Sequence, residues 1–255
     1  MVDTAGKFVW YELATPDMAA AQEFYGRVVG WTGQDAGMDD GPYTILSAGS
    51  VPVGGLRPIT PAQEVSGQRR GWGGYIAVAD VDAACVRVTQ AGGRVHRAAD
   101  DIPGVGRFAV VADPQGGAVT LFRGAGAPPP PVAGSTVGHV GWHELHADDW
   151  DTALEFYAKM FGWTRDHAVE MGPMGTYQIF ANAGAAAGGM MNKPQPGPTA
   201  WSFYFTVAAI GAAMARVTAA GGTVVQGPVE VPGGMWIVQA LDPQGVAFAL
   251  IADRR

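Results

Sequence analysis

Cysteine is almost absent from this chain, since Cys85 is the single one. A lone cysteine can form no disulfide within the chain and can supply no thiolate cluster for a metal ion. Its place on the apolar face of an expected helix, residues 81–91, indicates a small packing residue. The sequence therefore predicts neither a disulfide framework nor a cysteine-bound metal centre.

Excess positive charge and long apolar runs are also lacking. The net charge is −7, with a pI near 5.1, which argues against the basic surface that nucleic acid requires. No run of about 18 apolar residues occurs, and the N-terminus has neither a basic region nor a long apolar segment. We expect a soluble, cytoplasmic protein that has no nucleic acid or membrane as a partner.

What the chain does contain suffices for two folded domains. It has 255 residues, of which 48% are hydrophobic and 15% charged, so buried cores are expected rather than disorder. A proline-rich stretch with four consecutive prolines, 128–131, resembles a semi-rigid linker. We predict one domain over residues 1–124, a linker over 125–136 and a second domain over 137–255.

The two halves repeat each other. Residues 10–13 are Trp-Tyr-Glu-Leu and residues 142–145 are Trp-His-Glu-Leu, and each run is followed at the same spacing by a Phe-Tyr pair and a Gly-Trp pair. The sequence Asp-Pro-Gln-Gly occurs at 113–116 and again at 242–245. Agreement at a fixed offset across several elements is the mark of an internal duplication.

Within each half a unit of strand, helix and further strands occurs twice. A strand over 8–14 precedes a helix that Asp17 can cap, and a strand over 72–78 precedes a helix that Asp80 can cap. Residues 61–71 are polar and are expected to form a loop. Both Asp-Pro-Gln-Gly sequences are expected to be turns between paired strands. Four copies of one unit therefore make up the chain.

These motifs resemble the vicinal oxygen chelate superfamily, which includes glyoxalase I, bleomycin-resistance proteins and extradiol dioxygenases. In particular, the chain resembles the tandem-domain actinobacterial subgroup that is often called glyoxalase-like or hydroxylase. The resemblance implies an α+β fold in which four βαβββ modules form two glyoxalase-like domains, each with a cup-shaped mixed sheet around a pocket. In the enzymatic members a metal ion is held there by side chains of the first and last strands, usually histidine and glutamate.

Most positions that the resemblance assigns to metal ligands hold other residue types. The first-strand histidine positions hold Trp10 and Trp142. The equivalent positions of the second module in each half hold Gly73 and Ser202. The last-strand glutamate positions hold Thr120 and Ala249. The resemblance therefore implies the fold of the enzymes without their complete set of ligands.

The remaining donors are few. Glu12 offers one ligand in the first half, and Glu144 with His146 offers two in the second, because side chains two residues apart on a strand share a face. Zinc, iron and manganese sites need about three protein ligands. We predict no cofactor and keep a divalent metal at Glu144 and His146 as the alternative.

The residues expected to face the two cups combine aromatic rings with carboxylates and hydroxyls, as pockets for flat organic molecules do. The candidate ligand-binding residues are Trp10, Glu12 and Tyr75 in the first half and Trp142, Glu144, His146, Ser202 and Tyr204 in the second. The alternative is that the tryptophans fill a closed core. Glu12 and Glu144 have three possible roles, namely metal ligand, catalytic acid or base, and carboxylate satisfied by protein donors.

Two further residues have contrasting interpretations. His143 alternates with Glu144 along the strand and points the other way, so we expect a packing or interdomain residue rather than a ligand. Arg107, beside a glycine-rich turn, could meet an anionic ligand or form a salt bridge with a nearby acid.

We predict a metal-free tandem protein that binds a small aromatic or polyketide-like molecule. The alternative is an enzyme, either a metal-dependent lyase or dioxygenase of the glyoxalase kind or an accessory to a hydroxylase in secondary metabolism. Glu12 and Glu144 are then the catalytic candidates. A monomer with paired internal domains and a homodimer both remain open.

Overall fold

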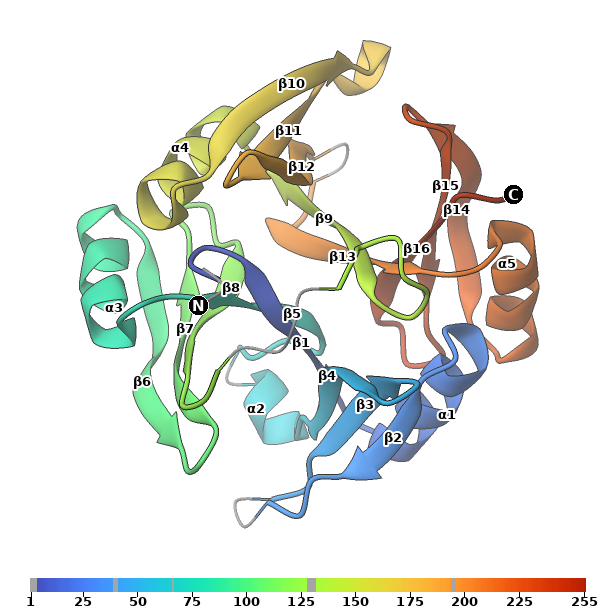
Figure 1. Ribbon diagram of the computed structural model, residues 1–255, viewed down its shortest axis with the longest axis horizontal. Helices are drawn as coiled ribbons and strands as arrows, with labels where there is room; N and C mark the ends of the chain where they lie inside the picture. Colours follow the sequence, from blue (N-terminus) through green and yellow to red (C-terminus); the bar gives the residue numbers. More distant parts are fainter. Residues whose placement is uncertain (1–3, 39–40, 66, 128–131, 194–195) are drawn as a thin grey trace. The chain divides into compact units, whose positions relative to one another are not determined.

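The computed structural model describes residues 4–38, 41–65, 67–127, 132–193 and 196–255. In these residues sixteen strands form two eight-stranded mixed sheets (Figure 1). The predicted α+β class and the four modules are confirmed. Over the same residues, no helix has the length and the apolar character that a membrane span needs.

Each half contributes eight strands to one sheet. The first half contains β1 (Phe8–Thr15), α1 (Met18–Val28), β2 (Thr32–Asp35), β3 (Thr44–Ala48), β4 (Val51–Pro58), α2 (Pro61–Val65), β5 (Gly71–Ala77), α3 (Val81–Gln90), β6 (Arg94–Ile102), β7 (Gly106–Ala112) and β8 (Ala118–Gly124). The second contains β9 (Val140–Ala147), α4 (Trp150–Phe161), β10 (Thr164–Glu170), the 3-10 helix η1 (Gly172–Met174), β11 (Thr176–Asn182), β12 (Ala185–Asn192), β13 (Ala200–Thr206), α5 (Ile210–Ala219), β14 (Thr223–Val231), β15 (Met235–Leu241) and β16 (Ala247–Ala252).

The strand orders are the same in the two sheets. They are β2-β3-β4-β1-β5-β8-β7-β6 and β10-β11-β12-β9-β13-β16-β15-β14. We number the modules 1 to 4 after their leading strands β1, β5, β9 and β13. In every module the leading strand runs parallel to the last one, while the three strands after the helix are antiparallel to one another.

The compact units of the chain do not follow the two halves. Unit 1 comprises Met1–Trp10, Gly73–Pro131 and His143–Trp201, and unit 2 comprises Tyr11–Trp72, Val132–Trp142 and Ser202–Arg255. Unit 1 thus holds most of modules 2 and 3, and unit 2 most of modules 1 and 4. The domain limits expected from the sequence, 1–124, 125–136 and 137–255, stay a prediction, and the four prolines 128–131 lie outside the described residues.

Side-chain caps fix where three of the helices begin. Asp17, Asp80 and Asp149 accept hydrogen bonds from backbone N–H groups of the first turns of α1, α3 and α4. The buried face of α1 carries Ala21, Phe24, Tyr25 and Val28, the apolar stripe that its periodicity predicts. In Figure 1 α3 lies beside α4 within unit 1, and α1 lies beside α5 within unit 2.

The expectation of a loop over 61–71 is wrong at its start, where α2 forms. Thr60 and Gln63 cap this short helix reciprocally, since Thr60 N donates to Gln63 Oε1 at 2.8 Å and Gln63 N donates to Thr60 Oγ1 at 3.3 Å. Pro61 occupies the first helical position, where its missing N–H is not needed. The Thr-Pro-x-Gln sequence carried this signal.

Both Asp-Pro-Gln-Gly sequences are turns, between β7 and β8 and between β15 and β16, so this prediction is confirmed. Each turn also has a partner that the sequence did not reveal. In unit 1 the Gln115 amide donates to Asp149 O and accepts from Asp149 N, both at 2.8 Å. In unit 2 Gln244 does the same with Asp17, both at 3.0 Å. Each turn thus clamps the start of the helix of the other module in its unit.

Each clamp is accompanied by a buried series of side-chain hydrogen bonds. In unit 1 the Trp201 indole donates to the Tyr157 hydroxyl at 2.9 Å, and that hydroxyl donates to Asp113 Oδ2 at 3.0 Å. Trp72, Tyr25 and Asp242 repeat the arrangement in unit 2. Burial raises the pKa of the Asp113 carboxyl above its usual range. These tyrosines, which follow the phenylalanine of each Phe-Tyr pair, therefore join the modules of a unit.

Candidate ligand-binding site

The strongest cluster of predicted site residues lies on β9 in unit 1. Glu144 Oε1 lies 3.2 Å from His146 Nε2, and the side chains are 8% and 23% exposed. The Tyr177 hydroxyl of β11 donates to Glu144 Oε2 at 3.0 Å. The two residues share a face, as the strand periodicity predicts, and a phenol that the sequence did not single out completes the cluster.

A glycine makes room for that phenol. Gly189 of β12 is the register partner of Glu144, and a Cβ atom at Gly189 would lie 2.2 Å from carbons of the Tyr177 ring. Real Cβ atoms do not approach other atoms so closely, so the ring can lie over the strand only where a side chain is missing. The sequence shows the Tyr-x(11)-Gly spacing, but no pattern of neighbouring residues relates Tyr177 or Gly189 to Glu144.

The first half repeats this geometry in unit 2 with one change. Glu12 of β1 pairs in register with Gly55 of β4, and the Tyr43 ring covers Gly55. Here Arg57 Nε donates to Glu12 Oε1 at 2.7 Å, with the arginine 35% and the glutamate 13% exposed. A permanently charged guanidinium thus holds this carboxylate.

Trp142 and Tyr204 come together within unit 2. Trp142, Met235 and Ile237 are partly buried and pack against buried Tyr204, Ala249 and Ile251. Gln239 Nε2 donates to the Tyr204 hydroxyl at 3.2 Å. This apolar cluster combines an accessible indole with a phenol whose ring is buried.

Three other predicted residues lie on β1, β5 and β13. Trp10 on β1 is half-buried, and Tyr75 on β5 is buried, with its ring edge-on to Phe122 at 5.9 Å between centroids. Ser202 on β13 is half-buried. Trp10 and Tyr75 belong to unit 1, whereas Glu12 and Ser202 belong to unit 2.

The two contrasting residues have packing and salt-bridge roles. His143 Nδ1–H donates to Ala187 O at 2.7 Å, and its ring stacks on Phe8 with centroids 4.2 Å apart. Burial lowers the pKa of His143 to about 4, so the imidazole is neutral. Arg107 pairs with Asp82 and Asp101 at 2.8 and 3.0 Å, so the salt-bridge interpretation is confirmed.

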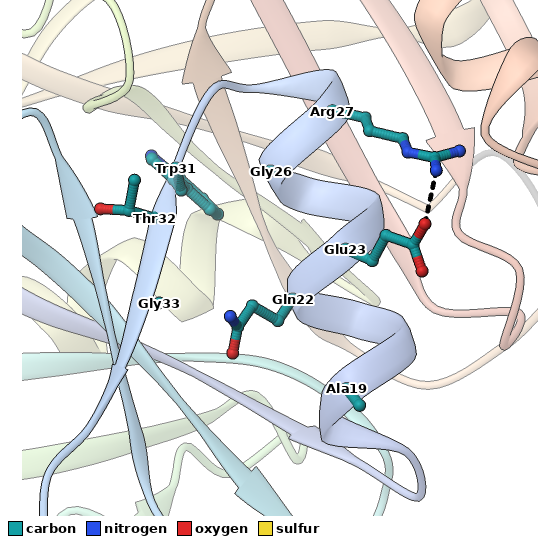
Figure 2. A pocket seen from close by; sticks show the side chains of 8 residues that line it. All are labelled: Ala19, Gln22, Glu23, Gly26, Arg27, Trp31, Thr32 and Gly33. Atoms are coloured by element: carbon teal, nitrogen blue, oxygen red, sulfur yellow. Dashed lines mark hydrogen bonds and ion pairs between the residues drawn. The ribbon is translucent and has the colours of Figure 1, made fainter.

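A surface depression of about 530 Å³ lies between α1 and β2 in unit 2 (Figure 2). Its lining residues are Ala19, Gln22, Glu23, Gly26, Arg27, Trp31, Thr32 and Gly33. The Glu23–Arg27 ion pair at its side is well exposed, and none of the predicted ligand-binding residues lines it. An open surface of this kind buries little of a ligand.

Comparison with known proteins decides the family. The model of the Glyoxalase/Bleomycin resistance protein/Dioxygenase superfamily matches residues 7–121 and again residues 136–250. The chain belongs to this superfamily. The double match agrees with the internal duplication and with the repeated strand order of the two sheets.

Several known proteins resemble the chain over nearly its whole length. CFP32 of Mycobacterium tuberculosis is 34% identical over 95% of this chain and 93% of its own. The anthracycline biosynthesis protein DauV of a Streptomyces species is 32% identical over 98% of this chain and 94% of its own. Among solved structures, the 2,3-dioxygenase LapB from Pseudomonas aligns with a TM-score of 0.65 at 13% identity, over 98% of this chain and 93% of its own.

A second solved structure, the Mn(II)-bound glyoxalase from Novosphingobium aromaticivorans, aligns with a TM-score of 0.64 at 17% identity. That alignment covers 99% of this chain and 83% of the glyoxalase. At such identities the two structural matches concern the fold alone.

The residues of this superfamily member do not fit a metal of the enzymatic kind. Within the ranges that the structure describes, no three His, Cys, Asp or Glu side chains come together. The last-strand positions hold Thr120 and Ala249, and alanine has no donor atom. Glu144 and His146 supply two of the roughly three donors a tight site needs. At Glu12, the guanidinium of Arg57 opposes a second cation.

Proposed function

We propose that this tandem protein binds a small, flat, aromatic or polyketide-like molecule, using the face of β9 and β11 that carries Glu144, His146 and Tyr177. The observation that carries the proposal is the buried Glu144 carboxylate with a phenol at 3.0 Å and an imidazole at 3.2 Å. A buried carboxylate is expensive unless donors surround it. Together the three groups offer donors and acceptors for the hydroxyl and carbonyl groups of such a ligand.

The relatives support this ligand class. DauV is described as an anthracycline biosynthesis protein, and anthracyclines are flat, hydroxylated, polycyclic aromatic compounds. Similarity along both chains makes a related aromatic compound the first choice for this protein. The remaining candidates, Trp10, Glu12, Tyr75, Trp142, Ser202 and Tyr204, stay predicted ligand contacts.

A titration of the full chain tests the proposal. Isothermal calorimetry with a panel of hydroxylated anthraquinones, naphthoquinones and flavones should find compounds that bind with defined stoichiometry. Tyr177→Phe removes one hydroxyl but keeps the ring, and should weaken binding about tenfold, the effect of losing a hydrogen bond to a charged group. Tyr43→Phe, its counterpart over Gly55 in unit 2, is the matched control, because binding at the proposed site on β9 and β11 in unit 1 should stay as in the parent. If no compound in the panel binds, the proposal fails.

The alternative, a metal-dependent lyase or dioxygenase, makes a different prediction. It requires about one transition metal ion per chain in protein purified without an affinity tag, and a loss of thermal stability on chelation. We propose instead a protein that needs no metal for ligand binding. Elemental analysis together with a melting curve in the presence of a chelator distinguishes the two.

A further inference from the structure

Each eight-stranded sheet ends in two edge strands, and these edges differ in regularity. The described edge strands are β2, β6, β10 and β14. Register shifts interrupt the pairing of β6, β10 and β14 with their inner neighbours. Bulges of this kind protect an exposed edge from pairing with another chain. Strand β2 pairs with β3 without a shift from Thr32 to Asp35, so its edge keeps the geometry that a further strand needs.

Alternate residues of β2 present their backbone groups to the outside of the sheet. Ala36 N donates to Tyr43 O at 2.9 Å, so these two residues form a hydrogen-bonded pair. Hydrogen-bonded and non-hydrogen-bonded pairs alternate along antiparallel strands. Counted back from Ala36, Gln34 bonds to β3, whereas Gly33 and Asp35 direct their N–H and C=O groups away from it. The outer edge of β2 therefore offers donors and acceptors at both residues.

The depression of about 530 Å³ adjoins the same strand (Figure 2). Gly33 lines it, and a Cβ atom there would overlap the Gln22 side chain, so this face of β2 points towards α1. Asp35, two residues further along β2, shares the face and is exposed. Arg27, which pairs with Glu23 and has 62% of its side chain exposed, also lines the depression. A carboxylate that enters beside Gly33 therefore meets an amide and a guanidinium.

Module 3 shows what fills the equivalent place in the second half. In the repeat, Arg165 of β10 stands where Gly33 stands, and Asp151 of α4 stands where Ala19 stands. Arg165 and Asp151 form an ion pair between strand and helix. Glycine and alanine leave no such pair in module 1, and both residues line the depression. The open place thus adjoins the regular edge, whereas the filled place adjoins a bulged one.

We propose that a second copy of the chain adds its β2 to this edge, antiparallel and about a two-fold axis at Gln34. The N–H and C=O groups of Gly33 then bond those of the partner's Asp35, and the two-fold axis repeats this contact. Because Gly33 has no side chain, the carboxylate of the partner's Asp35 enters the depression. There it accepts from the Gln22 amide, with the Arg27 guanidinium as the nearby opposite charge. Such an interface is self-complementary, as a two-fold dimer requires.

Sedimentation velocity of the full chain over a range of concentrations tests the proposal. The parent chain of 26.5 kDa should associate to twice that mass as the concentration rises. The double variant Gly33→Arg/Ala19→Asp reproduces the ion pair of module 3 and fills the depression, so it should stay monomeric over the same range. Asp35→Ala should raise the dissociation constant of the dimer at least about tenfold, the effect of losing a hydrogen bond to a charged group.

The matched control is the reverse exchange in module 3, Arg165→Gly/Asp151→Ala. It opens the equivalent place beside the bulged strand β10 and should leave dimerisation as in the parent. Hydrogen exchange of the parent needs no substitution. The amides of Gly33 and Asp35 should exchange more slowly at concentrations that favour the dimer than in dilute solution. Circular dichroism checks the folding of each variant, and if the double variant does not fold, hydrogen exchange and Asp35→Ala decide.

Three results would overturn the proposal. The first is a parent that stays monomeric at every concentration, which would leave the β2 edge to an extended segment of another protein. The second is a dimer in which the exchange of the Gly33 and Asp35 amides does not change with concentration, because the copies then meet elsewhere. The third is a dimer that Asp35→Ala leaves as stable as the parent, because the depression then receives no carboxylate.

Discussion

Replacing His143 with phenylalanine should change how the stability of the protein depends on pH. The stack on Phe8 can persist in this variant, but the bond to Ala187 O and the ability to ionise are lost. Burial lowers the pKa of His143 to about 4, while an unfolded histidine titrates near its usual 6.5. Between these values the unfolded chain binds a proton that the folded chain excludes. The contribution of the neutral His143 imidazole to the free energy of unfolding is therefore complete above about pH 6.5 and is lost as the pH falls towards 4.

The size of the effect follows from that window. Between about pH 7.5 and 5.5, proton binding to the unfolded chain should remove about 1.3 kcal/mol from the free energy of unfolding of the parent. The His143→Phe variant has no imidazole at this position, so its free energy of unfolding does not fall for this reason. Near pH 7.5 the parent should be more stable by about 1 kcal/mol, the typical worth of one hydrogen bond, and near pH 5.5 the two should be about equal. This range stays above the pI of about 5.1, where a chain without net charge tends to precipitate.

Urea unfolding curves at several pH values within this window measure the difference. Other ionisable groups, such as Asp113 with its raised pKa, are present in both proteins, so their effects cancel in the comparison. His167→Gln is the matched control, because it removes a histidine whose side chain is 66% exposed and leaves His143 and its bond to Ala187 O in place. A stability difference between parent and His143→Phe that does not vary with pH would refute the reasoning.

Three further substitutions test other parts of the structure. Gln115→Ala removes both bonds to the Asp149 backbone and should lower the free energy of unfolding by about 1–3 kcal/mol in urea; no change would mean that the clamp contributes nothing. Gly189→Ala places a methyl group 2.2 Å from the Tyr177 ring, so it should destabilise the fold by about 1–3 kcal/mol and weaken ligand binding; parental stability and binding would contradict the close approach. Trp142→Ala should lower the unfolding free energy by less than the about 3–5 kcal/mol of a fully buried tryptophan, because its ring is partly buried; the full loss would make it a closed-core residue.

The parts of the fold that were predictable rest on local signals. A capping aspartate before an apolar helix face gave the start of α1 at Asp17, and the Asp-Pro-Gln-Gly sequences gave both turns. The side-chain period of a strand placed Glu144 and His146 on one face. Each of these inferences needs only a few neighbouring residues, so sequence alone sufficed. The start of α2 carried an equally local capping signal, which the polar composition of 61–71 obscured.

The parts that were missed depend on pairings between distant residues. Arg57 reaches Glu12 because β4 lies parallel to β1 in one register, and the sequence specifies neither that register nor the direction of the side chains. Tyr177 reaches Glu144 because Gly189 leaves space, a relation among three strands. The clamps made by Gln115 and Gln244 could not be predicted either, because the four modules are similar and no local sequence signal shows which modules pair.

The composition of the two compact units has a consequence for synthesis on the ribosome. The last segment of unit 1 ends at Trp201, whereas unit 2 needs the C-terminal segment Ser202–Arg255 to join Tyr11–Trp72. Domains generally fold as units while the chain emerges, from the N-terminus onwards. Module 1 must therefore wait for module 4, because the groups that bind Tyr25 and the start of α1 lie in the segment Ser202–Arg255. During elongation α1 can pack on β2 and β4 of its own module, but Tyr25 and the start of α1 still lack their partners Asp242 and Gln244.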